Sequence, residues 1–266
     1  MIVLLAFSIF ILGAIAGSFL NVCIHRMPRE QSIVSPPSHC PHCRAPIKPY
    51  DNIPIVSYLV LGGRCRACGS RISPRYLAVE LLTAVCFLSI SLMFAQALPM
   101  MIVALIFFCS LIVVFFVDIE HQIIPDEISL GGIAFGVVVS IIYPPIQNTA
   151  SHYLAFLRSL GGLFMGGALF WFIRIVGGRV FKKEALGFGD VKLMAAIGAI
   201  LGPSLVLLTA FLAALIGSVI GLTLITIGRA ELGSRLPFGP FICLGAATAF
   251  LYGHQFIAWY FSLLRI

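Results

Sequence analysis

Long apolar runs recur along the whole chain and constrain its fold more than any other feature. A helix that crosses a bilayer needs about 20 predominantly apolar residues. The runs and the polar breaks between them predict eight helices: 2–22, 77–97, 99–117, 127–143, 154–176, 189–201, 204–227 and 239–262. The stretch 191–227 is too long for one crossing, and Gly202-Pro203 is where we expect a break. The sequence therefore predicts an all-α integral membrane protein, in which 189–201 is a partial or re-entrant helix.

Composition and charge agree with a chain that lies mostly in lipid. Of its 266 residues, 60% are hydrophobic and 10% are charged, whereas a soluble domain carries about 25% charged residues. The net charge of +7 does not indicate a nucleic-acid partner, because Lys and Arg gather in a few loops, as orientation signals do. Positive charges follow the first apolar run rather than precede it, which indicates a retained helix and not a cleaved signal peptide.

The distribution of loop charges predicts the orientation of the chain. The polar segment 23–76 holds eight of the 17 Lys and Arg residues, and we therefore expect it in the cytosol. The basic loops 177–188 and 228–238 then fall on the same side, and the uncharged loop 144–153 falls outside; seven helices would break this pattern. We expect a first transmembrane helix (1–22), a cytosolic insert (23–76) and a helical membrane domain (77–266).

The insert carries two Cys-x-x-Cys pairs, Cys40 with Cys43 and Cys65 with Cys68, separated by 21 residues. Two such pairs around a short polar segment are typical of a tetrahedral zinc site, and a segment of this size buries too little core to fold without a staple. Two disulfides are the alternative, which a reducing cytosol disfavours. His39 or His42 as a substitute ligand also stays open. Four further cysteines lie in apolar surroundings and are interpreted as small hydrophobic residues: Cys23, Cys86, Cys109 and Cys243.

Two aspartates next to membrane helices are the candidate catalytic residues. Asp118 follows the apolar run 101–117, and Asp190 ends the sequence Gly187-Phe-Gly189-Asp190 before another apolar stretch. The predicted topology places both at the cytosolic ends of their helices. Two carboxyl groups that share one proton can activate water while polarising a carbonyl group. The two glycines leave room beside Asp190 for an extended substrate backbone.

Other interpretations of these aspartates stay open. An Asp at a helix N-terminus is often only a cap, which fits Asp190 and also Asp126. Asp118 lies at a helix C-terminus, where its charge opposes the helix dipole, and is the more informative of the pair. In a zinc-bearing scaffold the aspartates would be caps. In a proton-coupled transporter they would be relays, but such groups lie near the membrane midplane.

An ordered set of motifs then gives a resemblance that covers nearly the whole chain. It comprises Gly17-Ser-Phe-Leu-Asn21, His25-Arg-Met-Pro28, both cysteine pairs, Asn52-Ile-Pro-Ile-Val-Ser-Tyr58, Gly62-Gly-Arg-Cys65, Arg75-Tyr76, Val79-Glu80, both aspartate motifs and Pro237-Phe-Gly-Pro-Phe241. In this order the motifs resemble the bacterial type IV prepilin peptidases, which belong to the Gly-x-Gly-Asp aspartic proteases. The chain departs from the family pattern at Arg64, Asp51 and Leu77, where Lys, Glu and Pro are usual.

The resemblance implies a bifunctional enzyme of the bacterial inner membrane. Such enzymes cut the basic leader of type IV prepilins or type II secretion pseudopilins after a glycine, at the cytosolic face, and then methylate the new N-terminus with S-adenosylmethionine. It implies Asp118 and Asp190 as the catalytic pair, supported by Gly187, Gly189 and Lys192.

Methylation is associated with the insert in this family, which points to Gly63 and Arg64 as residues near the methyl donor. The alternative is that the glycines only form the turn before the third cysteine. No Gly-rich methyl-donor motif is present. A general Gly-x-Gly-Asp protease without methyltransferase activity is the alternative enzyme.

Overall fold

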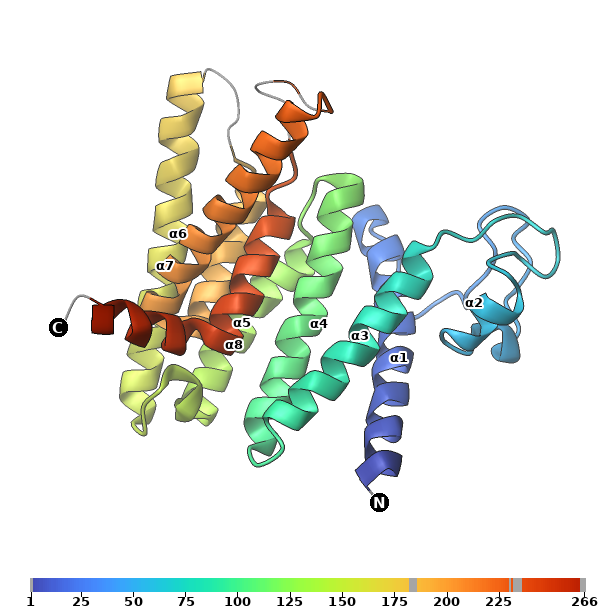
Figure 1. The fold of residues 1–266 in the computed structure, drawn as a ribbon, viewed down its shortest axis with the longest axis horizontal. Coiled ribbons are helices and arrows are strands. Elements are labelled where there is room, and N and C mark those ends of the chain that lie inside the picture. The colour runs from blue at the N-terminus through green and yellow to red at the C-terminus, as the bar shows by residue number, and fades with distance from the viewer. Residues whose placement is uncertain (1, 182–185, 230, 232–235, 264–266) are drawn as a thin grey trace. The chain divides into compact units, whose positions relative to one another are not determined.

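The computed structural model describes the chain except residues 1, 182–185, 230, 232–235 and 264–266 (Figure 1). Seven long helices account for most of the described residues: α1 (Ile2–Arg26), α3 (Arg75–Met93), α4 (Leu98–His121), α5 (Asp126–Ile142), α6 (His152–Phe181), α7 (Phe188–Thr226) and α8 (Gly239–Leu263). Short helical segments join them: η1 (Met27–Arg29), η2 (Pro49–Asn52), α2 (Val56–Val60) and η3 (Pro144–Gln147). The described part of the chain contains two isolated β-bridges and no strand.

Six of the described helices are long and apolar enough to cross a membrane: α1, α3, α4, α6, α7 and α8. Their exposed faces carry many large apolar side chains, which suits a surface in contact with lipid. The predicted fold class, an all-α integral membrane protein, is confirmed. Each of the eight predicted helices has a counterpart, because α7 contains two of them.

The predicted break in α7 is present at Gly202, whose φ of 78° and ψ of 178° are not helical. Pro203 has no N–H group, so the carbonyl of Ala199 loses its helical partner. Ser159 Oγ donates to this oxygen at 2.7 Å, and Gln147 Nε2 donates to the oxygens of Ala199 and Ile200 at 3.1 and 3.0 Å. Buried side chains from two other elements therefore satisfy the end of the first half of α7.

The chain divides into two compact units, Met1–Val113 and Val114–Ile266. In the first unit, α1 packs closely on α3 because two glycines of α1 face α3. A Cβ atom at Gly13 would lie 2.7 Å from Ala84 Cα, and one at Gly17 would lie 2.7 Å from Glu80 Cα. The boundary between the two units, after Val113, falls inside α4. The domain division at residues 22 and 76, which the polarity of the sequence predicts, stays a prediction.

The second unit is a bundle of the end of α4 with α5, α6, α7 and α8. The backbones of α6 and α7 touch where Gly162 faces Gly198. A side chain at either residue would collide with the other helix, so this close contact requires both glycines. Most residues in the first half of α7 are buried, including Leu193, Met194 and Ile197. The bundle therefore surrounds the helix that begins next to Asp190.

Candidate active site and metal centre

Asp118 lies in the last turn of α4 and is 5% exposed. Its Oδ2 atom accepts a hydrogen bond of 2.9 Å from the backbone N–H of Gly239, the first residue of α8. That N–H group has no partner within its own helix, so Asp118 caps α8. The sequence considered capping by Asp118 only in the scaffold alternative and did not indicate this partner, which is 121 residues away.

Gly239 is a site residue to which the sequence assigned no role. A Cβ atom there would lie 2.6 Å from Asp118 Oδ2, so the approach of α8 to the carboxylate requires a glycine. The available signal was a Gly-Pro pair that begins an apolar helix, Gly239-Pro240. This contact fixes one oxygen of the first aspartate.

Asp190 is the third residue of α7 and is 8% exposed. Its Oδ2 atom accepts a hydrogen bond of 3.0 Å from the N–H of Gly187, the residue that precedes the helix. The capping role considered from the sequence is therefore present. A Cβ atom at Gly189 would lie 3.1 Å from Ile124 Cβ, so this glycine lets the start of α7 pack against the segment that follows α4.

The second unit brings the two aspartates together. Both carboxyl groups are buried, and the charge of Asp118 acts on the carboxyl group of Asp190. Each uses Oδ2 to accept a backbone N–H, and among the described residues neither Oδ1 atom has a protein hydrogen-bond partner. Cys243 on α8 is buried within electrostatic reach of both, a neighbour for which the sequence gave no signal. Two fixed carboxyl groups within electrostatic reach of each other, each with a free oxygen atom, can bind and activate a water molecule.

Lys192 forms an ion pair with Asp126 at the start of α7. Its Nζ atom lies 2.7 Å from Oδ1 and 2.9 Å from Oδ2 of Asp126, and 5.1 Å from the centre of the Phe188 ring. The expected cap at Asp126 is not formed: the helix already begins at that residue, and its carboxylate binds Lys192 instead. The ion pair joins the first turns of α5 and α7.

The four cysteines of the insert come together in the first unit. Their Sγ atoms all lie within 4.8 Å of one another, and Cys40 Sγ is 3.9 Å from Cys68 Sγ. Sulfur atoms in a tetrahedral site with bonds of about 2.3 Å are separated by about 3.8 Å. The cysteines are free thiols and form no disulfides, and neither His39 nor His42 belongs to the group. The residues fit a metal ion with four thiolate ligands.

The two cysteine turns have matching backbones. The N–H of Arg44 donates to the oxygen of Cys40, and the N–H of Gly69 donates to the oxygen of Cys65, both at 2.9 Å. Gly69 has a φ of 70°, as expected for the turn after the second pair.

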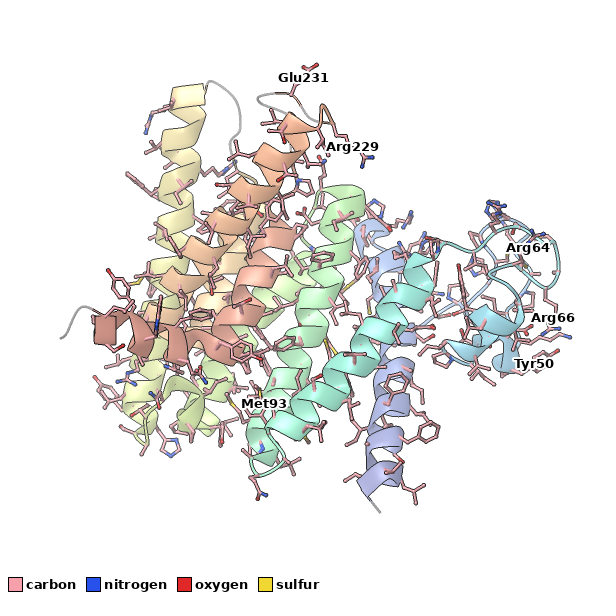
Figure 2. All side chains as sticks on the ribbon, viewed as in Figure 1. Tyr50, Arg64, Arg66, Met93, Arg229 and Glu231 are labelled. Carbon is pink, nitrogen blue, oxygen red and sulfur yellow. The ribbon has the colours of Figure 1, made fainter. Side chains whose placement is uncertain are left out.

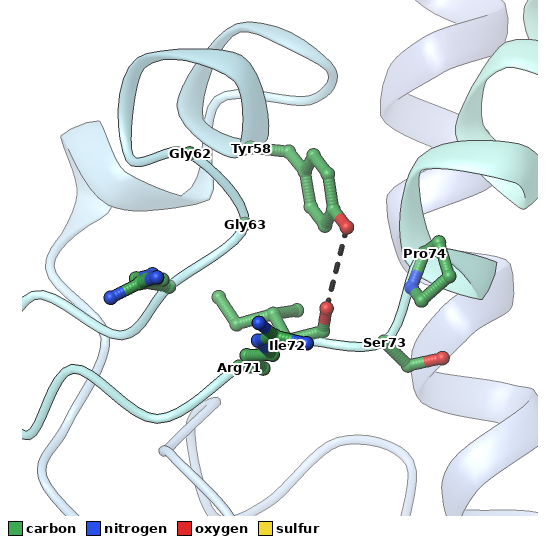
Figure 3. Close-up of a pocket in the computed structure, with 8 residues that line it drawn as sticks. Tyr58, Gly62, Gly63, Arg71, Ile72, Ser73 and Pro74 are labelled. Carbon is green, nitrogen blue, oxygen red and sulfur yellow. Dashed lines mark hydrogen bonds between the residues drawn. The ribbon is translucent and has the colours of Figure 1, made fainter.

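A cavity of about 510 Å³ lies next to α2 in the same unit (Figure 3). It is lined by Tyr58, Gly62, Gly63, Arg64, Arg71, Ile72, Ser73 and Pro74. Tyr58 donates its hydroxyl proton to the oxygen of Ile72 at 3.3 Å. Gly62 and Gly63 have φ angles of 59° and 66°, and a Cβ atom at Gly63 would lie 2.9 Å from the Tyr58 hydroxyl oxygen. The glycines thus form the turn after α2 and also line the cavity.

The fold and the site define a helical membrane protein with a buried pair of carboxyl groups and a four-cysteine insert. Residues 11–94 match the model of the bacterial peptidase A24 N-terminal domain, and residues 104–222 match the type IV leader peptidase family. The chain belongs to the type IV leader peptidase family. This confirms the resemblance found in the sequence motifs.

Curated relatives match over most of their length. A prepilin leader peptidase/N-methyltransferase of Aeromonas hydrophila is 31% identical over 96% of this chain and 93% of its own. One of Bacillus subtilis is 34% identical over 96% and 97%. A type 4 prepilin-like proteins leader peptide-processing enzyme of Escherichia coli is 39% identical over 90% and 91%. No solved structure matches the chain.

Proposed function

We propose that the chain is a prepilin leader peptidase that also methylates the N-terminus it creates. It cleaves the basic leader of type IV prepilins or type II secretion pseudopilins after a glycine, at the cytosolic face of the bacterial inner membrane. The observation that carries the proposal is the buried pair Asp118 and Asp190 in a member of the leader peptidase family. The names of the relatives support both activities, and the positive charge of the insert supports the orientation.

The peptidase step uses the two carboxyl groups as acid and base. The ionised carboxylate removes a proton from a water molecule, which attacks the carbonyl carbon of the glycine. The protonated carboxyl group donates to the carbonyl oxygen. The tetrahedral intermediate then breaks at the C–N bond, as the leaving amine takes the proton that the other carboxyl group removed from water. The N–H groups of Gly239 and Gly187 hold one oxygen of each aspartate, so the other oxygens keep their positions for this proton transfer.

Three residues next to Asp190 support this step. Gly187 supplies the N–H that orients the carboxylate, and Gly189 lets the helix start approach Ile124. Lys192 binds Asp126 and so fixes the first turn of α7 against α5. We assign these residues positioning roles, because none of them needs to exchange a proton with the substrate.

The methyl donor S-adenosylmethionine supplies an activated methyl group, and we assign it to the open pocket beside α2. Its volume of about 510 Å³ lies in the usual range for small ligands. Gly63 leaves space where a side chain would meet Tyr58. Arg64 and Arg71 provide positive charge for the carboxylate of the methyl donor. Arg64 keeps the positive charge of the Lys that is usual at this position in the family. The Tyr58 ring offers a flat apolar surface.

The four cysteines hold one structural zinc ion, which fits their sulfur geometry and the thiolate-rich ligand set. When bound, the ion would link the turns at Cys40 and Cys65, in a segment with little core of its own, and so would stabilise the insert and the pocket. The cysteines lie outside the unit that holds the two aspartates, so we assign the ion no part in peptide cleavage.

One experiment tests the two activities together. The purified protein in nanodiscs is incubated with S-adenosylmethionine and a peptide that contains a basic leader, Gly, Phe and an apolar helix, and the products are weighed by mass spectrometry. Cleavage after the glycine and a 14-dalton gain on the new N-terminus are expected. An intact peptide rejects the peptidase assignment; a cleaved, unmethylated product rejects only the methyltransferase assignment.

A further inference from the structure

The short helix α2 presents an apolar face that no other described part of the first unit covers. Ile53, Val56, Leu59 and Val60 are between 49% and 75% exposed. The opposite side of the helix binds the insert, because Ser57 Oγ donates to the oxygen of Tyr50 and Tyr58 donates to Ile72. Clustered apolar side chains of this kind mark a contact with a partner or with a membrane.

A hydrogen bond to α3 fixes the position of the start of α2 along the axis of that helix, and hence its depth in the membrane. The N–H of Ile55 donates to Glu80 Oε2 at 2.7 Å. Glu80 is buried in the second turn of α3, five residues after Arg75, which corresponds to about 7.5 Å along the helix axis. The 19 residues of α3 span about 28 Å, close to the apolar thickness of a bilayer. If α3 spans the apolar layer, the start of α2 therefore lies about 7.5 Å inside the edge at which α3 begins, which is the depth of an interfacial helix.

The backbone at this point is held in an unusual conformation. Ile55 has φ 63° and ψ −54°, and the N–H of Val56 donates to the oxygen of Pro54 at 2.6 Å. This tight turn is rare and strained for a β-branched residue. Glu80 stabilises the turn by accepting the Ile55 N–H. The position of α2 along the membrane helices is thus fixed by α3.

The residues around the apolar face suit the same location. Tyr50 lies beside α2 and is exposed, and the Lys48 Nζ atom lies 5.7 Å from the centre of its ring. Tyr50 and Arg66 point outward from the insert in Figure 2, and the Arg66 guanidinium group lies over the Tyr50 ring and pairs with Asp51. Tyrosine and basic residues at the edge of an apolar surface are typical of membrane interfaces, where head groups supply negative charge.

We propose that α2, together with the preceding Ile53, is an interfacial membrane anchor in which Ile53, Val56, Leu59 and Val60 insert between lipids beside α3. The anchor keeps the cavity on the other side of α2 at the membrane surface. This inference does not depend on the peptidase or methyltransferase activity, because it rests on exposed apolar area and on the Glu80 hydrogen bond.

Tryptophan fluorescence in nanodiscs tests the anchor. Trp171 and Trp259 are replaced by Phe, and a single tryptophan is introduced as Leu59→Trp or, as a matched control on the exposed loop between Cys65 and Cys68, as Ala67→Trp. Lipids brominated near the head-group end of the acyl chains should quench Leu59→Trp at least about threefold more than Ala67→Trp, with blue-shifted emission, because interfacial side chains lie about 5–10 Å into the bilayer.

Two outcomes would overturn the proposal. Equal quenching and equal emission maxima of the two tryptophans would place the α2 face in water. Blue-shifted emission of Leu59→Trp without quenching by brominated lipid would show that protein, such as a second copy, covers it. Val60→Trp repeats the measurement from the neighbouring position if Leu59→Trp is not monodisperse.

Discussion

The aspartate pair and the insert are built in opposite ways. The carboxyl groups of Asp118 and Asp190 are buried in a helical bundle and held by backbone N–H groups. The insert has short helices, a strained turn at Ile55 and a cluster of four cysteines. The helices around it set the geometry of a site in a packed bundle, whereas the proposed zinc ion and the hydrogen bond from Ile55 to Glu80 would hold the insert in shape. The two activities should therefore respond to different changes.

The largest expected effect is on cleavage after Asp118→Asn or Asp190→Asn. An amide has the size of the carboxyl group but cannot take a proton from water, so the cleavage rate should fall by about 10³-fold or more. The measurement is product mass over time, with thermal unfolding as the control for folding. Near-normal cleavage by either variant would show that the dyad is assigned wrongly.

Removal of the metal should separate the two regions. Elemental analysis should find one zinc ion per chain, and chelation should abolish methylation and lower the unfolding temperature of the insert. Cleavage should change by less than about twofold, since independent sites interact by only about 0.3–0.5 kcal/mol. Protein without metal, or with the cysteines paired as disulfides, would contradict the zinc site.

Gly239→Ala tests how closely the bundle positions Asp118. The new Cβ atom would lie 2.6 Å from Oδ2, and a displacement of about 1 Å at a catalytic group costs about 10²-fold in rate. We expect a loss approaching this value in the cleavage assay. Gly131→Ala on α5 is the matched control, because nothing lies within 4 Å of its added Cβ atom; an equal loss in both variants would argue against a local effect.

Some features of the molecule can be predicted from the sequence, and others only from the fold. The positions of the helices follow from the long apolar runs, and the cysteine cluster follows from the spacing of the two Cys-x-x-Cys pairs. Asp118 stands out because a charge ends an apolar run. Three contacts join segments that are distant in the sequence: Asp118 with Gly239, Asp126 with Lys192, and Ile55 with Glu80. Local sequence patterns carry no information on such pairs.

The cavity in the insert predicts a loss of methylation with little change in cleavage. Arg64→Ala should slow methylation about tenfold, because a hydrogen bond to a charged group contributes about 1.5–3 kcal/mol. Gly63→Ala should also slow it, since the added Cβ atom meets Tyr58. Gly62→Ala is the matched control, with similar backbone strain but nothing within 4 Å. A parallel loss of cleavage would count against a separate methyl-donor site.

The smallest expected effect concerns the ion pair between Lys192 and Asp126, which lies at the exposed edge of the bundle. Lys192→Met and Asp126→Asn should each slow cleavage about two- to fivefold, because partly exposed ion pairs contribute about 0.2–1 kcal/mol. If the pair only positions the start of α7, the double variant should be no slower than either single variant. The pH profile of cleavage should keep its shape, since neither residue exchanges a proton with the substrate. Losses that multiply in the double variant, or a shifted profile, would mean that Lys192 or Asp126 acts on the substrate directly, and the dyad would then need a third member.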